Sequence, residues 1–230
     1  SEDTEAVTKF NVGEAALVPE AFGCQMQSMA LERGTVVDAD DLLEEMVNTA
    51  REMATELGKI DGLSEEEQVI LFKQVGYGAL KYFLLKVSPK KSMMFDPKAS
   101  IDFIGNTAPF IQFNYVRASS MLAKCAEAGI NTQIKTIDAS VWDVDELRLI
   151  QHTLMWPGTI ELAAQQFDPS LIANYTYDLT KAFSRWYQDH QVLGEEIITI
   201  REARIALTQC VARTIKVAMG LLGIEMPQRM

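Results

Sequence analysis

Histidine and cysteine are scarce in this chain of 230 residues, which limits the chemistry it can carry. The two histidines, His152 and His190, lie about forty residues apart, and no cysteine or carboxylate stands near them in a metal-ligand spacing. The three cysteines, Cys24, Cys125 and Cys210, contain no Cys-x-x-Cys pair, which argues against a zinc site. No glycine-rich phosphate loop or serine nucleophile motif is present either. We therefore expect no metal site and no catalytic residue, and we expect both histidines to be structural.

Long apolar runs are absent as well. The chain contains no stretch of about 18 apolar residues, so we expect no transmembrane helix and no membrane partner. The first residues, Ser1-Glu2-Asp3, are acidic, whereas a secretory signal begins with basic residues. An odd number of widely spaced cysteines suits a reducing compartment. Together these features predict a cytoplasmic protein.

Positive charge is in deficit overall but is concentrated in one segment. The chain has 21 basic and 32 acidic residues, a net charge of −11, which argues against indiscriminate binding to DNA or anionic membranes. Residues 73–135 nevertheless hold 9 basic and 3 acidic residues (+6), whereas residues 1–72 carry −13 and residues 136–230 carry −4. A polyanion would therefore meet one attractive face and be repelled elsewhere.

Helix signals are abundant after residue 37. Apolar residues recur with a helical period there, and no strong strand alternation competes with them. Ser64-Glu65-Glu66-Glu67 reads as a capping box, and Trp156-Pro157-Gly158 reads as a break between two helices. The expected helices span about 39–57, 65–87, 109–127, 143–154, 159–166, 168–190 and 199–222. Residues 1–36 have no clear period, so the prediction is an all-α bundle preceded by an irregular segment.

One acidic cluster has two readings. Asp143-Val144-Asp145-Glu146 could suggest a cation site, since carboxylates are the ligands that hard cations prefer. Acidic residues in a first helical turn also complement the helix dipole. We favour the second interpretation.

The most informative stretch runs from Gly76 to Arg117. A Gly-Tyr-Gly helix with lysines and aromatic residues leads into Ser88-Pro89-Lys90-Lys91, and Asn106-Thr107-Ala108-Pro109-Phe110 then opens another helix. Fixed positive charges beside flat rings suit single-stranded RNA, because cations neutralise phosphates and rings stack on splayed bases. The alternative is that residues 82–85 are helix core and that the lysines form an ordinary solvated face.

This order of motifs resembles the junction between the catalytic core and the anticodon-binding helical domain of class I arginyl-tRNA synthetases. The Asp168–Tyr187 helix, the Arg201–Leu207 stretch and the ending Gly220–Met230 resemble the same family, so the match covers roughly residues 34–230. The resemblance implies an anticodon-binding bundle at 106–230 and a helical connection from the catalytic core at 37–105. It also leads us to expect Met230 as a natural C-terminus and a monomer that binds arginine tRNA.

The ATP signature of that family is missing. Class I synthetases use a His-Ile-Gly-His motif to hold ATP, and nothing in this chain resembles it. The family's second signature loop, which begins with a lysine, would fall at Ser28-Met29-Ala30-Leu31-Glu32-Arg33-Gly34. Ser28 stands in the place of that lysine, so residues 1–36 could be a remnant of the loop. We expect the chain to bind no cofactor and to be inactive alone, ATP being held by the full-length family enzyme. Three functions stay open: the anticodon-binding part of a full-length enzyme, an inactive paralogue that binds tRNA or a protein in trans, or a helical scaffold without RNA binding.

The resemblance also places the RNA. In the family the anticodon loop unstacks against the helical domain, near the Asn-Thr-Gly-Pro helix start, along the tyrosine-bearing helices and at the last residues. The alternative for Tyr115 and Tyr187 is burial in the bundle with satisfied hydroxyls. Including two lysines expected to contact phosphates, the candidate tRNA-binding residues are Lys90, Lys91, Asn106, Gln112, Tyr115, Arg117, Tyr175, Tyr187 and Met230.

Overall fold

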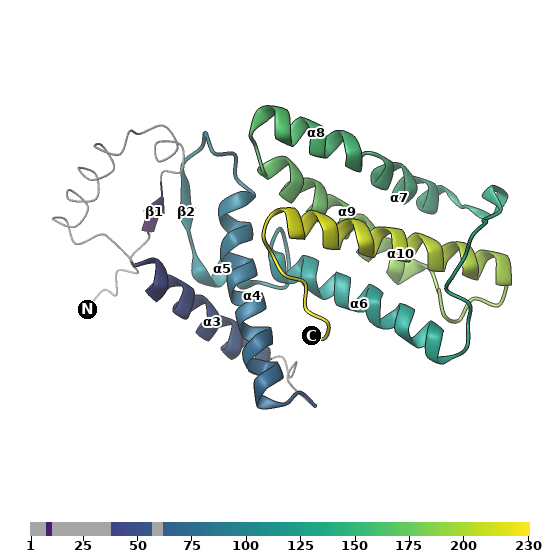
Figure 1. The fold of residues 1–230 in the computed structure, drawn as a ribbon, viewed down its shortest axis with the longest axis horizontal. Helices are drawn as coiled ribbons and strands as arrows, with labels where there is room; N and C mark the ends of the chain where they lie inside the picture. The colour runs from purple at the N-terminus through teal and green to yellow at the C-terminus, as the bar shows by residue number, and fades with distance from the viewer. Residues whose placement is uncertain (1–7, 11–37, 57–61) are drawn as a thin grey trace.

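The computed structural model describes residues 8–10, 38–56 and 62–230 and is mainly helical (Figure 1). Its elements follow the chain in this order: β1 (Thr8–Phe10), α3 (Ala39–Glu56), α4 (Glu65–Leu85), β2 (Met93–Phe95), α5 (Pro97–Ile101), α6 (Ala108–Glu127), the 3-10 helix η1 (Ala139–Val141), α7 (Val144–Leu154), α8 (Trp156–Gln166), α9 (Ser170–Asp189) and α10 (Ile198–Leu221).

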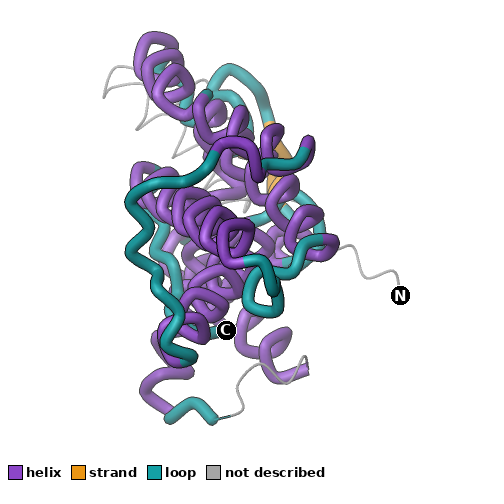
Figure 2. The backbone as a smooth tube through the Cα atoms, turned by 90° about the vertical axis from the view of Figure 1, so that its right-hand side faces the viewer, coloured by secondary structure: helices purple, strands orange, loops and turns teal. Residues whose placement is uncertain are grey.

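Helices α6 to α10 form a bundle around one hydrophobic cluster. Helix α9 contacts α6, α7, α8 and α10. Figure 1 shows α7 and α8 one after the other along one side of the bundle, and Figure 2 shows that most of the described backbone is helical. Leu179, Phe183, Ile205 and Ile215 are completely buried in this cluster. The apolar stripes that the sequence displays therefore meet in one core, and burying them is the main term that stabilises such a bundle.

Helices α3, α4 and α5 pack around a second, smaller cluster on the other side of α4 (Figure 1). Its members include Met46 from α3, Val75 from α4 and Ile101 from α5. Helix α4 joins the two clusters, because Leu80 packs in the smaller one and Tyr82 in the larger one. The division of the chain at residue 105 stays a prediction, and this shared helix couples the parts on its two sides.

Local sequence explains where the helices begin. Ser64 and Asp143 each cap a helix through a reciprocal capping box, which satisfies backbone amides that have no partner within the helix. Thr107 caps α6, and Pro109 lies in its first turn, where a missing amide hydrogen costs nothing. Phe167 ends α8 in the left-handed conformation, with φ of 51°.

The structure confirms the all-α bundle and corrects three details. The sequence predicts a break at Trp156-Pro157-Gly158, but α8 already begins at Trp156. Pro157 does not prevent this, because it occupies a first-turn position where proline is permitted. Helix α5 was not predicted. A short antiparallel ladder pairs Thr8 with Phe95, so one strand lies within the segment predicted to be irregular.

Several predictions concern residues that the structure does not describe. The candidate signature loop at 28–34 lies outside the described residues, as does most of the segment 1–36.

Among the helices of the described part, none has the length and apolar character needed to cross a membrane.

Candidate functional site

A groove of about 420 Å³ lies between the second half of α6 and the end of α9. Helix α6 contributes Arg117 and Lys124, and α9 contributes Tyr187 and Gln188. The loop that follows α9 closes the groove, with Gln191 among its lining residues. The groove therefore joins two cations and a ring from segments about seventy residues apart in the sequence.

Arg117 and Tyr187, one from each helix, line this groove in contact with each other. The guanidinium carbon of Arg117 lies 4.4 Å from the centroid of the Tyr187 ring, well within the range of a cation–π contact. Arg117 Nη1 also donates a long hydrogen bond of 3.4 Å to Asn114 Oδ1, and the Tyr187 ring packs 5.7 Å from the Phe183 ring. Both side chains are half-buried, so each is held by its neighbours and still faces the groove.

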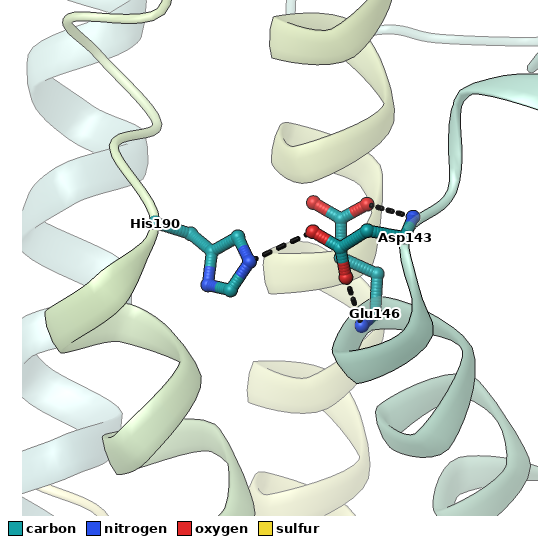
Figure 3. Close-up of side chains that lie close together, drawn as sticks. All are labelled: Asp143, Glu146 and His190. Carbon is teal, nitrogen blue, oxygen red and sulfur yellow. Dashed lines mark hydrogen bonds and ion pairs between the residues drawn. The ribbon is translucent and has the colours of Figure 1, made fainter.

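The end of α9 is fixed to the start of α7 by His190 (Figure 3). His190 Nε2 lies 2.8 Å from Asp143 Oδ2, and Nδ1 lies 2.9 Å from the carbonyl oxygen of Trp186. Both partners are acceptors, so the ring donates to both only as the imidazolium. Burial alone would raise the pKa of the Asp143 carboxyl, but hydrogen bonds from the Glu146 amide and from His190, and the charge of His190, lower that pKa below its usual value.

Asp143, Glu146 and His190 also have the composition of a metal site. One possible ligand atom from each lies within 4.8 Å of the others. Their hydrogen bonds account for the arrangement, however: Asp143 Oδ1 accepts from two amides of α7, Asp143 Oδ2 contacts His190, and the two Glu146 oxygens accept from the Asp143 amide and from Arg204. We therefore interpret this cluster as a helix cap with an ion-pair network, and His190 as a structural histidine.

The basic turn lies at the opposite end of α9 from the groove. Lys90 and Lys91 are exposed, and the Lys91 amide donates to the Ser88 carbonyl. Burial raises the pKa of Asp168, just before α9, but hydrogen bonds from Ser170 and Ser88 and the charge of Lys90 lower it overall. Helix α9 has 20 residues, so the turn and the groove are about 30 Å apart at 1.5 Å per residue.

Asn106 takes part in a polar junction between α4, α6 and α9. The Tyr82 hydroxyl lies 2.6 Å from Asn106 Oδ1 and 2.9 Å from the Ala173 carbonyl, and Asn106 Nδ2 donates to Asn174 Oδ1 at 3.2 Å. Lys86 Nζ donates to the Asn106 carbonyl at 2.9 Å, and burial lowers the pKa of Lys86. Asn106 Oδ1, Asn106 Nδ2 and the Asn106 carbonyl thus each have a partner within the protein.

Two candidate residues lie in the interior. Gln112 is fully buried, and its Nε2 donates to the carbonyls of Gln74 and Glu225. Tyr175 is 8% exposed, donates to the His152 carbonyl and stacks on Trp156 at 5.2 Å, and burial raises its pKa to about 12. Their burial favours a structural role for both in this conformation.

The remaining candidates lie apart from the groove lining. Tyr115 is half-buried against the core of the bundle, and Met230 packs against the smaller cluster of α3, α4 and α5. The structure therefore brings together Arg117 and Tyr187 and distributes the other predicted residues over the molecule. Sequence reasoning missed Lys124 and Gln191, although Lys124, seven residues after Arg117, lies on the same face of α6 by the helical period.

Comparison with known proteins places this arrangement in a family. The model of the DALR anticodon binding domain matches residues 111–230, which is more than half of the chain and includes every groove residue named above. The chain belongs to the DALR anticodon-binding family. In that family context, the groove lies within the matched domain, between its first helix, α6, and its α9–α10 connection.

Curated relatives extend the similarity beyond this domain. The chain is 49% identical over 202 residues to the arginine–tRNA ligase of Bacteroides thetaiotaomicron, covering 88% of this chain and 34% of the relative. It is 48% identical to that of Flavobacterium psychrophilum, covering 88% and 33%. Among solved structures, Thermus thermophilus arginyl-tRNA synthetase matches with a TM-score of 0.76 and 27% identity over 85% of this chain and 32% of that one. The chain thus spans about a third of the length of the curated relatives it matches.

Proposed function

We propose that the chain binds the anticodon arm of arginine tRNA, as the C-terminal part of an arginine–tRNA ligase in protein synthesis. The observation that carries this proposal is the groove in which Arg117 covers the Tyr187 ring. The similarity to curated arginine–tRNA ligases supports the choice of tRNA.

The groove offers two of the interactions that an unpaired base needs. The Tyr187 ring, with the Arg117 guanidinium over one face, provides a stacking partner for a base, and such stacking is tolerant of base identity. The guanidinium of Arg117 provides a planar cation that stacks on rings and pairs with phosphates. Because Phe183 and Asn114 hold these side chains, little conformational entropy is lost on binding.

Lysines at two places supply contacts to the phosphate backbone in this proposal. Lys124 lines the groove itself, and Lys90 and Lys91 are exposed at the far end of α9. The separation of about 30 Å along α9 is too long for one unstacked base, so we assign the groove to a base of the loop and the Lys90–Lys91 turn to backbone phosphates. Asn106, Gln112 and Tyr175 then act by holding the helices in place.

In this proposal, another part of the full-length ligase carries out the chemical step. The chain alone binds no cofactor and activates no arginine, and ATP is held by the remaining two thirds of the full-length enzyme. The chain acts as a monomer in the cytoplasm.

The test measures binding of a labelled anticodon-arm hairpin of arginine tRNA to the full chain by fluorescence anisotropy. Tyr187→Ala removes the stacking ring and should weaken binding by about 1–3 kcal/mol, while Tyr187→Phe keeps the ring and should bind nearly as the parent does. Tyr177→Ala is the matched control, because it removes the same side chain from the same helix outside the groove lining. Circular dichroism of each variant checks folding.

The salt dependence of binding separates phosphate contacts from stacking. Replacing Lys90 with Ala should reduce the slope of log affinity against log salt by about 0.7 if its phosphate contact is to a single strand, whereas Tyr187→Ala should leave the slope unchanged. The proposal is wrong if the folded Tyr187→Ala variant binds as tightly as the parent, or if the parent does not distinguish the arginine hairpin from that of another tRNA.

A further inference from the structure

Arg204 of α10 contacts two other segments, α7 and the loop that follows α9. Its Nε donates to Glu146 Oε1 at 2.8 Å, and its Nη1 donates to the Gln191 carbonyl and to Glu195 Oε2, each at 2.8 Å. The Arg204 side chain is 13% exposed and that of Glu146 is 1% exposed. Arg204 therefore joins α7, α10 and the loop after α9 through one planar cation.

The loop from Gln191 to Glu195 needs such support. Within these residues, all of which the structure describes, the backbone contributes one long bond of 3.4 Å from the Glu195 amide to the Val192 carbonyl. Val192 is buried in the bundle core, and Arg201 Nη1 donates to the Glu195 carbonyl at 3.2 Å. Side chains therefore fix the path of this loop far more than its own backbone does.

The same loop forms one wall of the groove. Gln191, Val192, Leu193 and Gly194 line it together with Lys124 of α6. Gly194 lies against the Gln191 side chain, since an added Cβ would meet Gln191 Oε1 at 2.8 Å. Arg204 therefore contacts the loop at a residue, Gln191, that also lines the groove.

We propose that Arg204 is a positioning residue for RNA binding: it holds the 191–195 loop so that the groove beside Tyr187 keeps the shape that accepts a base. This inference rests on the proposed function. Arg204 acts through the Gln191 carbonyl and the Glu195 carboxylate and does not itself contact RNA. A lysine cannot replace it, because an ammonium lacks the planar fork that serves Glu146, Gln191 and Glu195 together.

The experiment compares Arg204→Lys with Arg213→Lys in the full chain. Arg213 is exposed on the same helix, so the two variants share the chemical change and the net charge. Each is assayed for binding of the anticodon-arm hairpin at several salt concentrations and for hydrogen exchange of the loop amides. If Arg204→Lys fails to fold, Glu195→Gln is tested in its place. This variant weakens the contact between Arg204 and the loop and leaves the ion pair between Arg204 and Glu146 intact.

We expect Arg204→Lys to bind the hairpin about tenfold more weakly, the scale of one lost charge-assisted hydrogen bond. Its salt slope should equal that of the parent, and its loop amides should exchange faster while those of residues 211–219 do not. Arg213→Lys should match the parent in all three measurements. An unchanged slope is the signature of positioning, because a lost phosphate contact would lower it.

Three results would overturn the inference: a loosened loop with unchanged affinity, a weakened affinity with unchanged loop exchange, or a reduced salt slope. If the parent chain itself does not bind the hairpin, the proposed function fails. Loop exchange in Arg204→Lys would then show whether the contact has a purely structural role.

Discussion

Gly76→Ala should destabilise the protein although it replaces a poor helix former by the best one. Gly76 lies in α4 where this helix crosses α3, and an added Cβ would stand 2.8 Å from the Met46 carbonyl oxygen and 2.9 Å from the Met46 carbonyl carbon. Carbon atoms pack at about 3.5–4.0 Å, so the two helices would have to separate by more than half an ångström. Backbone atoms cannot rotate away as the end of a side chain can.

The magnitude follows from two opposing terms. Alanine in a helix gains about 1 kcal/mol over glycine. Overpacking costs about 1–3 kcal/mol, and the upper end applies because the neighbours are backbone and because Met46, Leu71 and Val75 are buried at this contact. We expect the free energy of unfolding to fall by about 2 kcal/mol, which corresponds to a lower melting temperature by about 4–8 °C for a chain of this size.

The matched control is Gly220→Ala. Gly220 lies in α10 with nothing within 4 Å of an added Cβ, so the substitution should raise stability by up to about 1 kcal/mol. Urea denaturation followed by circular dichroism measures both variants. If Gly76→Ala is as stable as the parent or as Gly220→Ala, the close approach of α3 and α4 is not the constraint that we infer.

Two further predictions concern buried and capping polar groups. The Asp143 pKa is lowered in the folded state, so its contribution to stability is present above the unfolded value of about 3.9 and is lost as the pH falls through the folded value. Urea titrations at pH 7 and pH 3.5 should show a smaller acid loss for Asp143→Asn than for the parent, and equal losses would contradict the cap. Tyr82→Phe removes the buried hydroxyl that contacts Asn106 Oδ1 and the Ala173 carbonyl and should cost about 1–3 kcal/mol of stability in the same assay; a neutral result would show that the hydroxyl is dispensable.

The helices could be predicted because their signals are local. The capping box at Ser64, the acidic first turn at Asp143 and the apolar period of α9 are each contained within a few turns of the chain. Helix α5 escaped prediction because its five residues are too few to display a period. The β1–β2 ladder escaped it because a pairing between residues 8 and 95 leaves no mark on either three-residue strand.

The candidate site was harder to predict, because it depends on which face of each helix points inward. Gln112 and Arg117 are both polar and lie on the same helix, yet Gln112 is fully buried and Arg117 lines the groove. Tyr175 and Tyr187 differ in the same way on α9. The loop at Gln191 has no periodicity at all, and its place in the groove follows from Arg204, which lies 13 residues further along the chain.

Helix packing explains the two glycines of the Gly-Tyr-Gly stretch of α4, which is part of the family resemblance. Gly76 admits the backbone of α3, and Gly78 admits Gln112 and Ile224, whose atoms would lie 2.9 and 3.2 Å from an added Cβ. Lys81 of the same helix and Lys86, which caps its C-terminal end, also serve the fold: Lys81 Nζ donates to the Gly223 carbonyl at 2.7 Å, and Lys86 Nζ donates to that of Asn106. A cation whose hydrogen bonds go to the main chain is less available to a phosphate than Lys90 or Lys91, which are exposed at the turn. The sequence pattern that identifies the family therefore marks how its helices fit together, while RNA contact falls in our proposal to the less distinctive residues of α6 and α9 and to the Lys90–Lys91 turn.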